Sequence, residues 1–263
     1  MSELIACARD DRGVYTLEIC RPEVRNALNP ETFVELVACC TEIDTDPGAR
    51  AVVLRGRGCA FSAGGDFGTL NDLLEGGRDV ALVELRNANA GVLALASLRV
   101  PTVAALNGDA YGGGATMALA CDFRLMAATA RLGFVFARLG LSGADTGATW
   151  WLTRLLGAAR TLEILGLGRV FSADEALDAG LVTEVAPADR FDGAVDAFAS
   201  RLAALAPRAV QGTKRALAGI ESRSLAAQLD LEADIQADVI CTADFSEGLA
   251  AFTDKRSAQF KGE

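Results

Sequence analysis

Short apolar runs alternate with amphipathic segments along the first half of the chain. The predicted strands of this part cover residues 15–19, 51–55, 102–107 and 122–127. The predicted helices between them cover Pro30–Thr45, 80–97 and 115–120. Repeated strand, turn and helix units favour a layered α/β fold with parallel strand pairing, in which function sits at the turns that follow the strands.

From about residue 149 onward the pattern becomes mostly helical. The predicted helices cover residues 149–156, 158–165, 173–179, 191–205 and 213–243, and one strand covers 181–185. The composition changes little here, and no linker or internal repeat is visible. We therefore expect a core over residues 1–200, followed by a helical region over residues 201–263.

Two glycine turns are the most informative feature of the chain. Residues 59–66 read CAFSAGGD and residues 107–114 read NGDAYGGG, and each turn separates an apolar run from a predicted helix. Glycine lets the backbone come close to a ligand, and a helix start offers free N–H groups at its positive end. Two such turns facing one oxygen could stabilise an enolate, which indicates chemistry on an acyl group.

Composition sets limits on this interpretation. With 263 residues, of which 51% are hydrophobic, the chain can bury one large core. Its apolar runs fall short of the roughly 20 residues that a membrane helix needs. The first residues show no basic segment followed by an apolar one, so we expect no targeting signal and a cytoplasmic location.

The chain contains no histidine, which excludes several reaction types. Cys/His and Ser-His-Asp nucleophiles are impossible, and the commonest zinc ligand is missing. The seven cysteines form no CxxC pair, so we expect neither a disulfide nor a metal site. Proton transfer near neutral pH must therefore use a carboxylate, water, or a Lys, Cys or Tyr with a shifted pKa.

A net charge of −10 argues against a nucleic-acid partner. The three lysines all lie in the last fifth of the chain, and Lys255 and Lys261 bound a short run that contains Phe260. This run is either a solvated helix end or a phosphate clamp with Phe260 as a stacking surface.

Five segments in order carry a resemblance to a known family. They cover residues 21–29, 61–66, 101–122, 140–157 and 171–185. With them the chain resembles the crotonase superfamily, also called the enoyl-CoA hydratase/isomerase family, along nearly its whole length. The matches are very specific for the family and much less specific for the reaction. Members of the family share an oxyanion hole but catalyse several different reactions.

The resemblance implies an α/β spiral of ββα repeats whose C-terminal helices mediate homotrimers, often paired into hexamers. It implies an acyl-CoA substrate and no cofactor besides the coenzyme A of that substrate. It assigns the oxyanion hole to the backbone N–H groups of Gly65 and Gly113, where the two glycine turns also place it. The alternative is that residues 112–114 are glycines for close helix–strand packing alone.

Two departures from the hydratase pattern bear on the reaction. Where the resemblance leads us to expect two catalytic glutamates, this chain has Thr116 and Phe136, which become candidate substrate contacts. A general acid or base typically contributes about 10²–10⁴ in rate, so hydration through a glutamate pair is disfavoured.

Asp145 is the remaining candidate base. It resembles the acidic residue of isomerase-like members, and one carboxylate is enough to remove a proton at one carbon and return it at another. Apolar neighbours could desolvate it and raise its pKa. The alternative is a helix N-cap ahead of the helix predicted from residue 149.

The other candidate residues are expected to bind the substrate and not to take part in the reaction. Asp66 is a candidate substrate contact, although its place at a helix start favours a cap. Tyr111 could bind substrate through its hydroxyl or pack beside the glycines. By resemblance, the coenzyme A contacts are Arg25, the backbone of Ala63, and Lys255 and Phe260 of a neighbouring subunit. Residues 68–86 are expected to form a mobile wall of the acyl pocket.

These expectations leave three functions open. The leading one is double-bond isomerisation of an enoyl-CoA with Asp145 as the base. The second is hydration, with water held by Asp145 and backbone groups. The third is a catalytically idle relative that binds coenzyme A, or RNA, against which the acidic composition argues.

Overall fold

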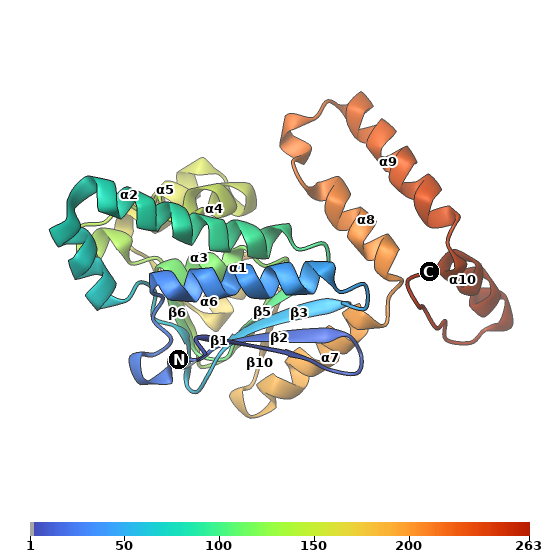
Figure 1. The fold of residues 1–263 in the computed structure, drawn as a ribbon, viewed down its shortest axis with the longest axis horizontal. Coiled ribbons are helices and arrows are strands. Elements are labelled where there is room, and N and C mark those ends of the chain that lie inside the picture. Colours follow the sequence, from blue (N-terminus) through green and yellow to red (C-terminus); the bar gives the residue numbers. More distant parts are fainter. Residues whose placement is uncertain (1–2) are drawn as a thin grey trace.

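The computed structural model describes residues 3–263 and contains two sheets (Figure 1). The larger sheet has the order β1-β2-β3-β5-β7-β10, and its neighbours are parallel except for the antiparallel pair β1 and β2. Its strands are β1 (Ile5–Arg9), β2 (Val14–Ile19), β3 (Ala51–Gly56), β5 (Thr102–Leu106), β7 (Phe123–Ala127) and β10 (Glu184–Ala186). The smaller sheet has the order β4-β6-β8-β9. Its strands are β4 (Ala60–Ser62), β6 (Asp109–Tyr111), β8 (Arg131–Gly133) and β9 (Val170–Ser172).

The strands follow one another in ββα units that pass from the large sheet to the small one. One unit runs β3, β4 and α2 (Phe67–Ser97), and the next runs β5, β6 and α3 (Gly113–Leu119). A third runs β7 and β8, and then η2 (Phe136–Leu139), α4 (Ala148–Leu156) and α5 (Ala158–Leu167). This is the expected α/β spiral, and both glycine turns lie where a short strand of the small sheet ends.

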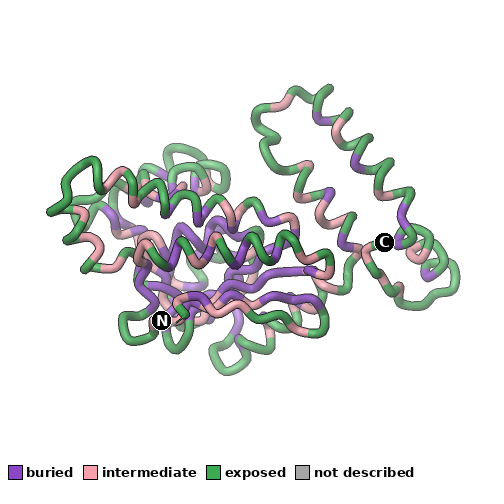
Figure 2. Tube along the Cα trace, in the orientation of Figure 1, coloured by how far each residue is buried: buried purple, intermediate pink, exposed green. Residues whose placement is uncertain are grey.

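The hydrophobic core lies between the large sheet and the helices that cover it, as the buried strands in Figure 2 show. All five residues of β5 are buried, as a central parallel strand with both faces covered requires. Helix α1 (Pro30–Thr45) packs against α2 and has the predicted bounds. It begins there because the Asn29 side chain accepts the N–H of Thr32 and Pro30 suits the first turn.

Helix α2 corrects the prediction for its region. The expected helix began at residue 80, after a mobile wall, but the structure is helical from Phe67, with Asp66 as the N-cap. The chain departs from helical geometry at Gly77, whose φ is +72°. The glycines of this stretch have low helix propensity, which hid the part of the helix before residue 80 from sequence reasoning.

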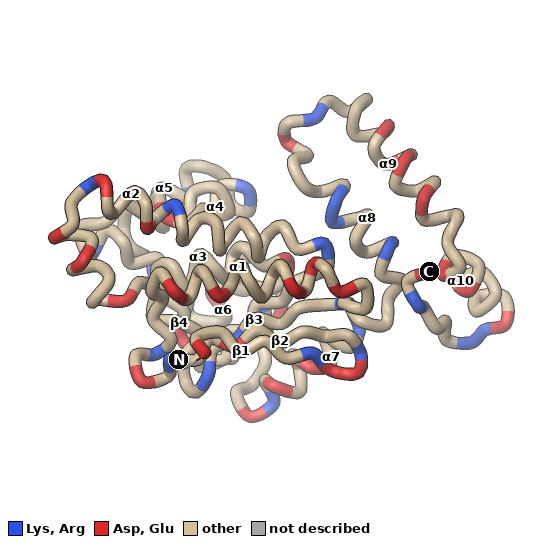
Figure 3. Tube along the Cα trace, viewed as in Figure 1, with Lys and Arg blue, Asp and Glu red and all other residues tan. Residues whose placement is uncertain are grey.

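The C-terminal part of the chain is mostly helical. Helices α6 (Ala173–Asp178) and α7 (Phe191–Ala203) pack against the sheets, and α8 (Pro207–Leu217), α9 (Leu225–Ile240) and α10 (Ala243–Asp254) follow them. Helices α8–α10 form an arm that extends away from the core and is largely exposed (Figures 1 and 2). Basic side chains mark α8 and acidic ones mark α9 (Figure 3).

The prediction of one helix over residues 213–243 is wrong. The chain turns at Gly219, whose φ is +69°, and the side chains of Ser224 and Thr242 then start two new helices by accepting backbone N–H groups. Within residues 3–263, no helix combines the length and the apolar composition that crossing a membrane requires.

Candidate active site

The two glycine turns lie side by side because β4 and β6 pair in parallel. A methyl group placed on Gly64 would lie 2.7 Å from the carbonyl oxygen of Tyr111 and 3.5 Å from the backbone nitrogen of Gly113. Gly64 also has a φ of +93°, which L side chains rarely adopt. The backbone of the first glycine turn therefore lies directly against the backbone of the second, so the two turns are adjacent as predicted.

Both proposed oxyanion donors have an unused N–H group. Gly65 forms a parallel bridge with Leu28, in which the Leu28 N–H donates to the Gly64 carbonyl (2.7 Å) and the Asp66 N–H donates to the Leu28 carbonyl (2.9 Å). In a parallel bridge the N–H of the bridged residue itself points away from that partner. Gly113 is the first residue of α3, where an N–H has no partner within the helix. In the part of the chain that the structure describes, neither N–H finds an acceptor.

The alternative role of the triple glycine, which is to allow close helix–strand packing, holds for Gly114. A methyl group on Gly114 would lie 2.6 Å from the Cβ atom of Ser62, so this glycine permits close packing. A methyl group on Gly113 would meet nothing closer than Leu28 Cδ1 at 3.8 Å and Asp145 Oδ2 at 3.9 Å. Gly113 therefore faces the side chain of the candidate base.

Asp145 is partly buried, and its surroundings favour the protonated form. Desolvation raises the pKa of its carboxyl group above the ordinary value. The cap interpretation of Asp145 is wrong, because α4 begins at Ala148 with Gly147 as its N-cap and no side-chain cap bond. Instead, the Oδ2 atom of Asp145 lies near Gly113 of the second glycine turn.

A strained turn presents Asp145. Thr146 has a φ of +44°, which is unfavourable for a β-branched residue, and Gly147 follows with a φ of +93°. A methyl group on Gly147 would lie 2.9 Å from the indole nitrogen of Trp151, so glycine is needed beside that ring. The Thr146 hydroxyl is buried without a hydrogen-bond partner among residues 3–263.

Apolar side chains surround the turns. The ring of Phe136 is buried, and its Cε1 atom lies 3.7 Å from a methyl group placed on Gly112. Leu70 lies 3.7 Å from a methyl group placed on Gly65. Thr116 is fully buried, and its hydroxyl donates to the Gly112 carbonyl (3.2 Å), so it braces the turn and is engaged within the protein.

Asp66 acts as the helix cap that its position suggested. One carboxylate oxygen accepts the N–H groups of Gly68 and Thr69, and the other pairs with Arg21 at 2.9 Å. Desolvation acts to raise the pKa of Asp66, but the two N–H groups and Arg21 outweigh it and hold this pKa below its ordinary value.

The proposed coenzyme A contacts fall in two places. Arg25 and Ala63 are exposed and joined, because the Ala63 N–H donates to the Arg25 carbonyl (2.9 Å). Lys255 ends α10, and Phe260 lies 3.6 Å from a methyl group placed on Gly248 of that helix. The arm carries both residues away from the oxyanion turns of the same chain (Figure 1).

The Tyr111 ring packs on a glycine of the neighbouring strand, and not on the triple glycine that follows it in the chain. A methyl group on Gly133 would lie 2.3 Å from the Cδ1 atom of Tyr111, so the ring lies directly on that glycine of β8.

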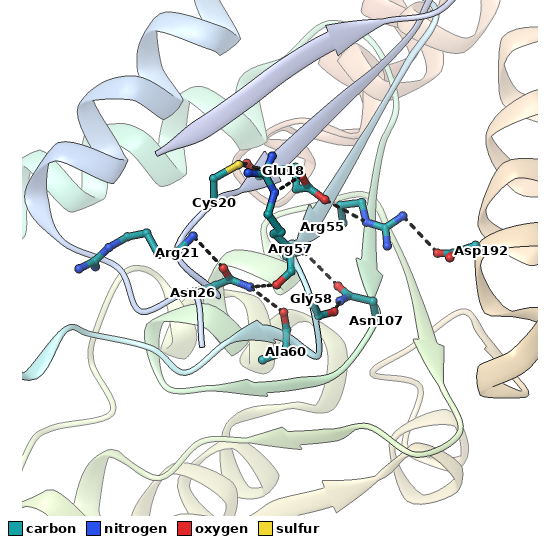
Figure 4. A network of polar contacts seen from close by, with 11 residues as sticks. Glu18, Cys20, Arg21, Asn26, Arg55, Arg57, Gly58, Ala60, Asn107 and Asp192 are labelled. Carbon is teal, nitrogen blue, oxygen red and sulfur yellow. Dashed lines mark hydrogen bonds and ion pairs between the residues drawn. The ribbon is translucent and has the colours of Figure 1, made fainter. Parts of the chain in front are cut away.

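Sequence reasoning missed the polar network that holds the first glycine turn (Figure 4). Asn26 is fully buried, and its amide donates to the carbonyls of Arg57 (2.9 Å) and Ala60 (2.8 Å) while accepting the N–H of Arg21 (3.0 Å). Asn107 accepts the N–H of Gly56 and donates to the Gly58 carbonyl. The signal available in the sequence was Asn26 itself, which lies within the segment 21–29 that carries the family resemblance.

The chain matches the model of the enoyl-CoA hydratase/isomerase family over residues 9–263. It is 35% identical over 254 residues to the 1,2-epoxyphenylacetyl-CoA isomerase of Escherichia coli K12, covering 96% of this chain and 97% of that protein. It is 33% identical to the enoyl-CoA isomerase/hydratase fer4 of Mycosarcoma maydis, covering 95% and 93%. The crystal structure of the enoyl-CoA hydratase from Bacillus anthracis superposes with a TM-score of 0.93 at 32% identity, covering 99% and 100%. The chain therefore belongs to the enoyl-CoA hydratase/isomerase family of the crotonase superfamily.

Proposed function

We propose that this enzyme moves a carbon–carbon double bond of an enoyl-CoA thioester by proton transfer. Asp145 is the base, and the N–H groups of Gly65 and Gly113 hold the enolate oxygen. The observation that carries the proposal is the position of the Asp145 carboxylate, 3.9 Å from a methyl group placed on Gly113. Base and oxyanion donor are thus within the span of one small acyl group.

The proposed reaction needs one carboxylate and no net change in atoms. Asp145 removes a proton from the carbon between the thioester carbonyl and the double bond of a 3-enoyl-CoA. The electron pair moves onto the thioester oxygen, where two N–H groups stabilise it. The protonated Asp145 then returns the proton to the far carbon of the former double bond, which gives the conjugated 2-enoyl-CoA.

The environment of Asp145 supports this role. Its raised pKa makes the carboxylate a stronger base than an exposed aspartate and the carboxyl group a competent proton donor. The Phe136 ring occupies the wall beside Gly112, where it supplies no second acid and keeps water from that side. A single acid–base group favours isomerisation. It disfavours hydration, which is the activity named for several relatives.

The proposal extends to coenzyme A and to the assembly. Arg25 and the backbone of Ala63 bind the coenzyme A part of the substrate, and no further cofactor is needed. The arm packs on a neighbouring subunit in a homotrimer or hexamer and brings Lys255 and Phe260 to that subunit's site. Exposed apolar side chains on the arm support association, among them Leu229, Leu249 and Phe252, the last 87% exposed.

Steady-state assays test the reaction. The purified protein is assayed with 3-enoyl-CoA and 2-enoyl-CoA substrates that carry aliphatic or aryl acyl groups. We expect a conjugated product from the 3-enoyl-CoA and a loss of rate of about 10²–10⁴ in Asp145→Asn. Asp178→Asn, an exposed aspartate on α6, is the matched control and should keep full activity.

Each other outcome contradicts the proposal in a different way. Loss of conjugation from a 2-enoyl-CoA, with no isomerisation, would establish hydration. Coenzyme A binding without turnover on any substrate would establish an idle relative. Full isomerase activity in Asp145→Asn would place the base elsewhere.

A further inference from the structure

A hollow of about 610 Å³ lies on the small sheet, apart from the candidate active site. It is lined by residues of β6, β8, η2 and the segment leading into β9, namely Tyr111, Arg131, Arg138, Leu167, Arg169 and Val170. Its volume falls within the range of small-molecule sites. None of the proposed catalytic groups lines it, so it offers a second place for a ligand.

Two glycines fix the floor and one wall of the hollow. The Tyr111 ring lies on Gly133, where a methyl group would come within 2.3 Å of the ring and 3.3 Å of Val170. The Arg138 side chain lies on the turn at Gly168, where a methyl group would come within 3.0 Å of its Cγ atom. The Tyr111 ring therefore packs against β8, and the aliphatic part of the Arg138 side chain packs against the turn at Gly168.

The positive charges of the hollow are incompletely neutralised. Within residues 3–263, neither Arg131 nor Arg138 has a carboxylate at ion-pair distance. Arg169 shares two glutamates, with nitrogen–oxygen distances of 3.6 Å to Glu163 and 3.7 Å to Glu175. Arg131 and Arg138 therefore bring two guanidinium groups without an ion pair to one hollow of a chain whose net charge is −10.

The neighbouring acid and the phenol are consistent with this geometry. One oxygen of the Asp109 carboxylate accepts the backbone N–H of Arg131 at 2.9 Å, and the charge of Asp109 lies near the Tyr111 phenol. Burial raises the pKa of Tyr111 and Asp109 adds to the rise, whereas the charges of Arg131 and Arg138 act against it. Tyr111, Arg131 and Arg138 all line the same hollow.

We propose that this hollow binds a phosphate group of a small molecule, with Arg131 and Arg138 as its charged ligands and the Tyr111 hydroxyl as a further donor. Guanidinium groups donate paired hydrogen bonds that match the oxygens of a phosphate. Two free guanidinium charges equal the charge of a phosphate dianion, whereas a single carboxylate would leave one of them unneutralised. The phosphate belongs either to the nucleotide end of coenzyme A or to a separate phosphate-bearing compound.

Calorimetric titration with inorganic phosphate and with pyrophosphate tests the site. Sodium chloride keeps the ionic strength constant, so that general screening does not count as binding. Wild-type protein should bind both anions, and Arg131→Gln with Arg138→Gln should raise Kd at least about tenfold, because two charged hydrogen-bond donors are lost. Arg190→Gln with Arg201→Gln removes the same charge at the two ends of α7 and should leave Kd unchanged.

A second titration identifies the source of the phosphate. If pyrophosphate binds equally well with saturating coenzyme A present, the hollow serves a separate compound. If the two compete and the double variant also weakens coenzyme A binding, the phosphate is that of coenzyme A. Absence of phosphate and pyrophosphate binding to the wild type, or an unchanged Kd in Arg131→Gln with Arg138→Gln, overturns the proposal. Both arginines are exposed, so the variant should fold normally.

Discussion

Gly64→Ala tests the contact on which the oxyanion hole depends. The new methyl group would lie 2.7 Å from the Tyr111 carbonyl oxygen, a distance that real Cβ atoms essentially never show. The oxygen belongs to the backbone of β6, whose pairing with β4 and β8 restricts any shift. Relief of the contact must therefore come from movement of one glycine turn relative to the other.

The expected cost has two parts. A φ of +93° in an alanine costs about 1–2 kcal/mol of folding free energy. Overpacking against backbone adds about 1–3 kcal/mol, so the free energy of unfolding should fall by about 2–5 kcal/mol in total. In the proposed mechanism, displacement of one N–H donor lowers kcat by about 10²–10³.

Urea unfolding measures the loss of stability, and steady-state kinetics measure the loss of activity. Gly180→Ala is the matched control. Gly180 has a φ of +73° and no heavy atom within 4 Å of an added methyl group, so it reports the backbone cost alone. Gly64→Ala should be less stable than Gly180→Ala, and it alone should lose activity. Equal stabilities and full activity in both variants would refute the close approach of the two turns.

Further predictions concern three neighbouring residues. Asn26→Ala leaves the buried carbonyls of Arg57 and Ala60 without their donor and should lower the free energy of unfolding by about 2–4 kcal/mol, measured by urea titration. Thr146→Gly removes an unfavourable left-handed conformation and should raise this free energy by about 1 kcal/mol, visible as a higher Tm; an unchanged or lower Tm would contradict this. The raised pKa of Asp145 predicts that the acid limb of the pH profile of kcat/KM lies above the ordinary aspartate value of about 3.9. A raised folded-state pKa means that ionised Asp145 opposes folding above the unfolded-state pKa, so Asp145→Asn should be more stable than wild type at neutral pH although inactive.

The elements that the sequence predicted well have strong local signals. Helix α1 begins at an asparagine cap followed by proline, and its bounds follow from these two residues. The central strand β5 is an uninterrupted apolar run, as burial on both faces demands. The strands of the small sheet have three residues each, too few for any periodicity to show, and they were not predicted.

The residues of the candidate site also differ in whether the sequence alone could locate them. Gly65 and Gly113 could be located because glycine turns after strands are local features, and the family resemblance named the same residues. The position of Asp145 beside Gly113 depends on the left-handed turn at Thr146 and on packing around Gly147, which no spacing encodes. The Asn26 network joins residues more than thirty positions apart, so it required the folded chain. The arginines of the hollow come from three segments that pairing of β8 and β9 brings together.

The arrangement of ββα units explains how one fold can hold different reactions. The β3–β4–α2 unit supplies Gly65 and the β5–β6–α3 unit supplies Gly113, both as backbone donors that survive substitution of nearby side chains. The unit that begins with β7 and β8 supplies Phe136 and Asp145, the side chains that face the turns. In the proposed mechanism, stabilisation of the enolate and choice of the proton donor are therefore encoded in separate units. A change to two-glutamate hydration would require substitutions at Phe136 of the β7–β8 unit and at Thr116 of α3, while the backbone donors of the oxyanion hole stay intact.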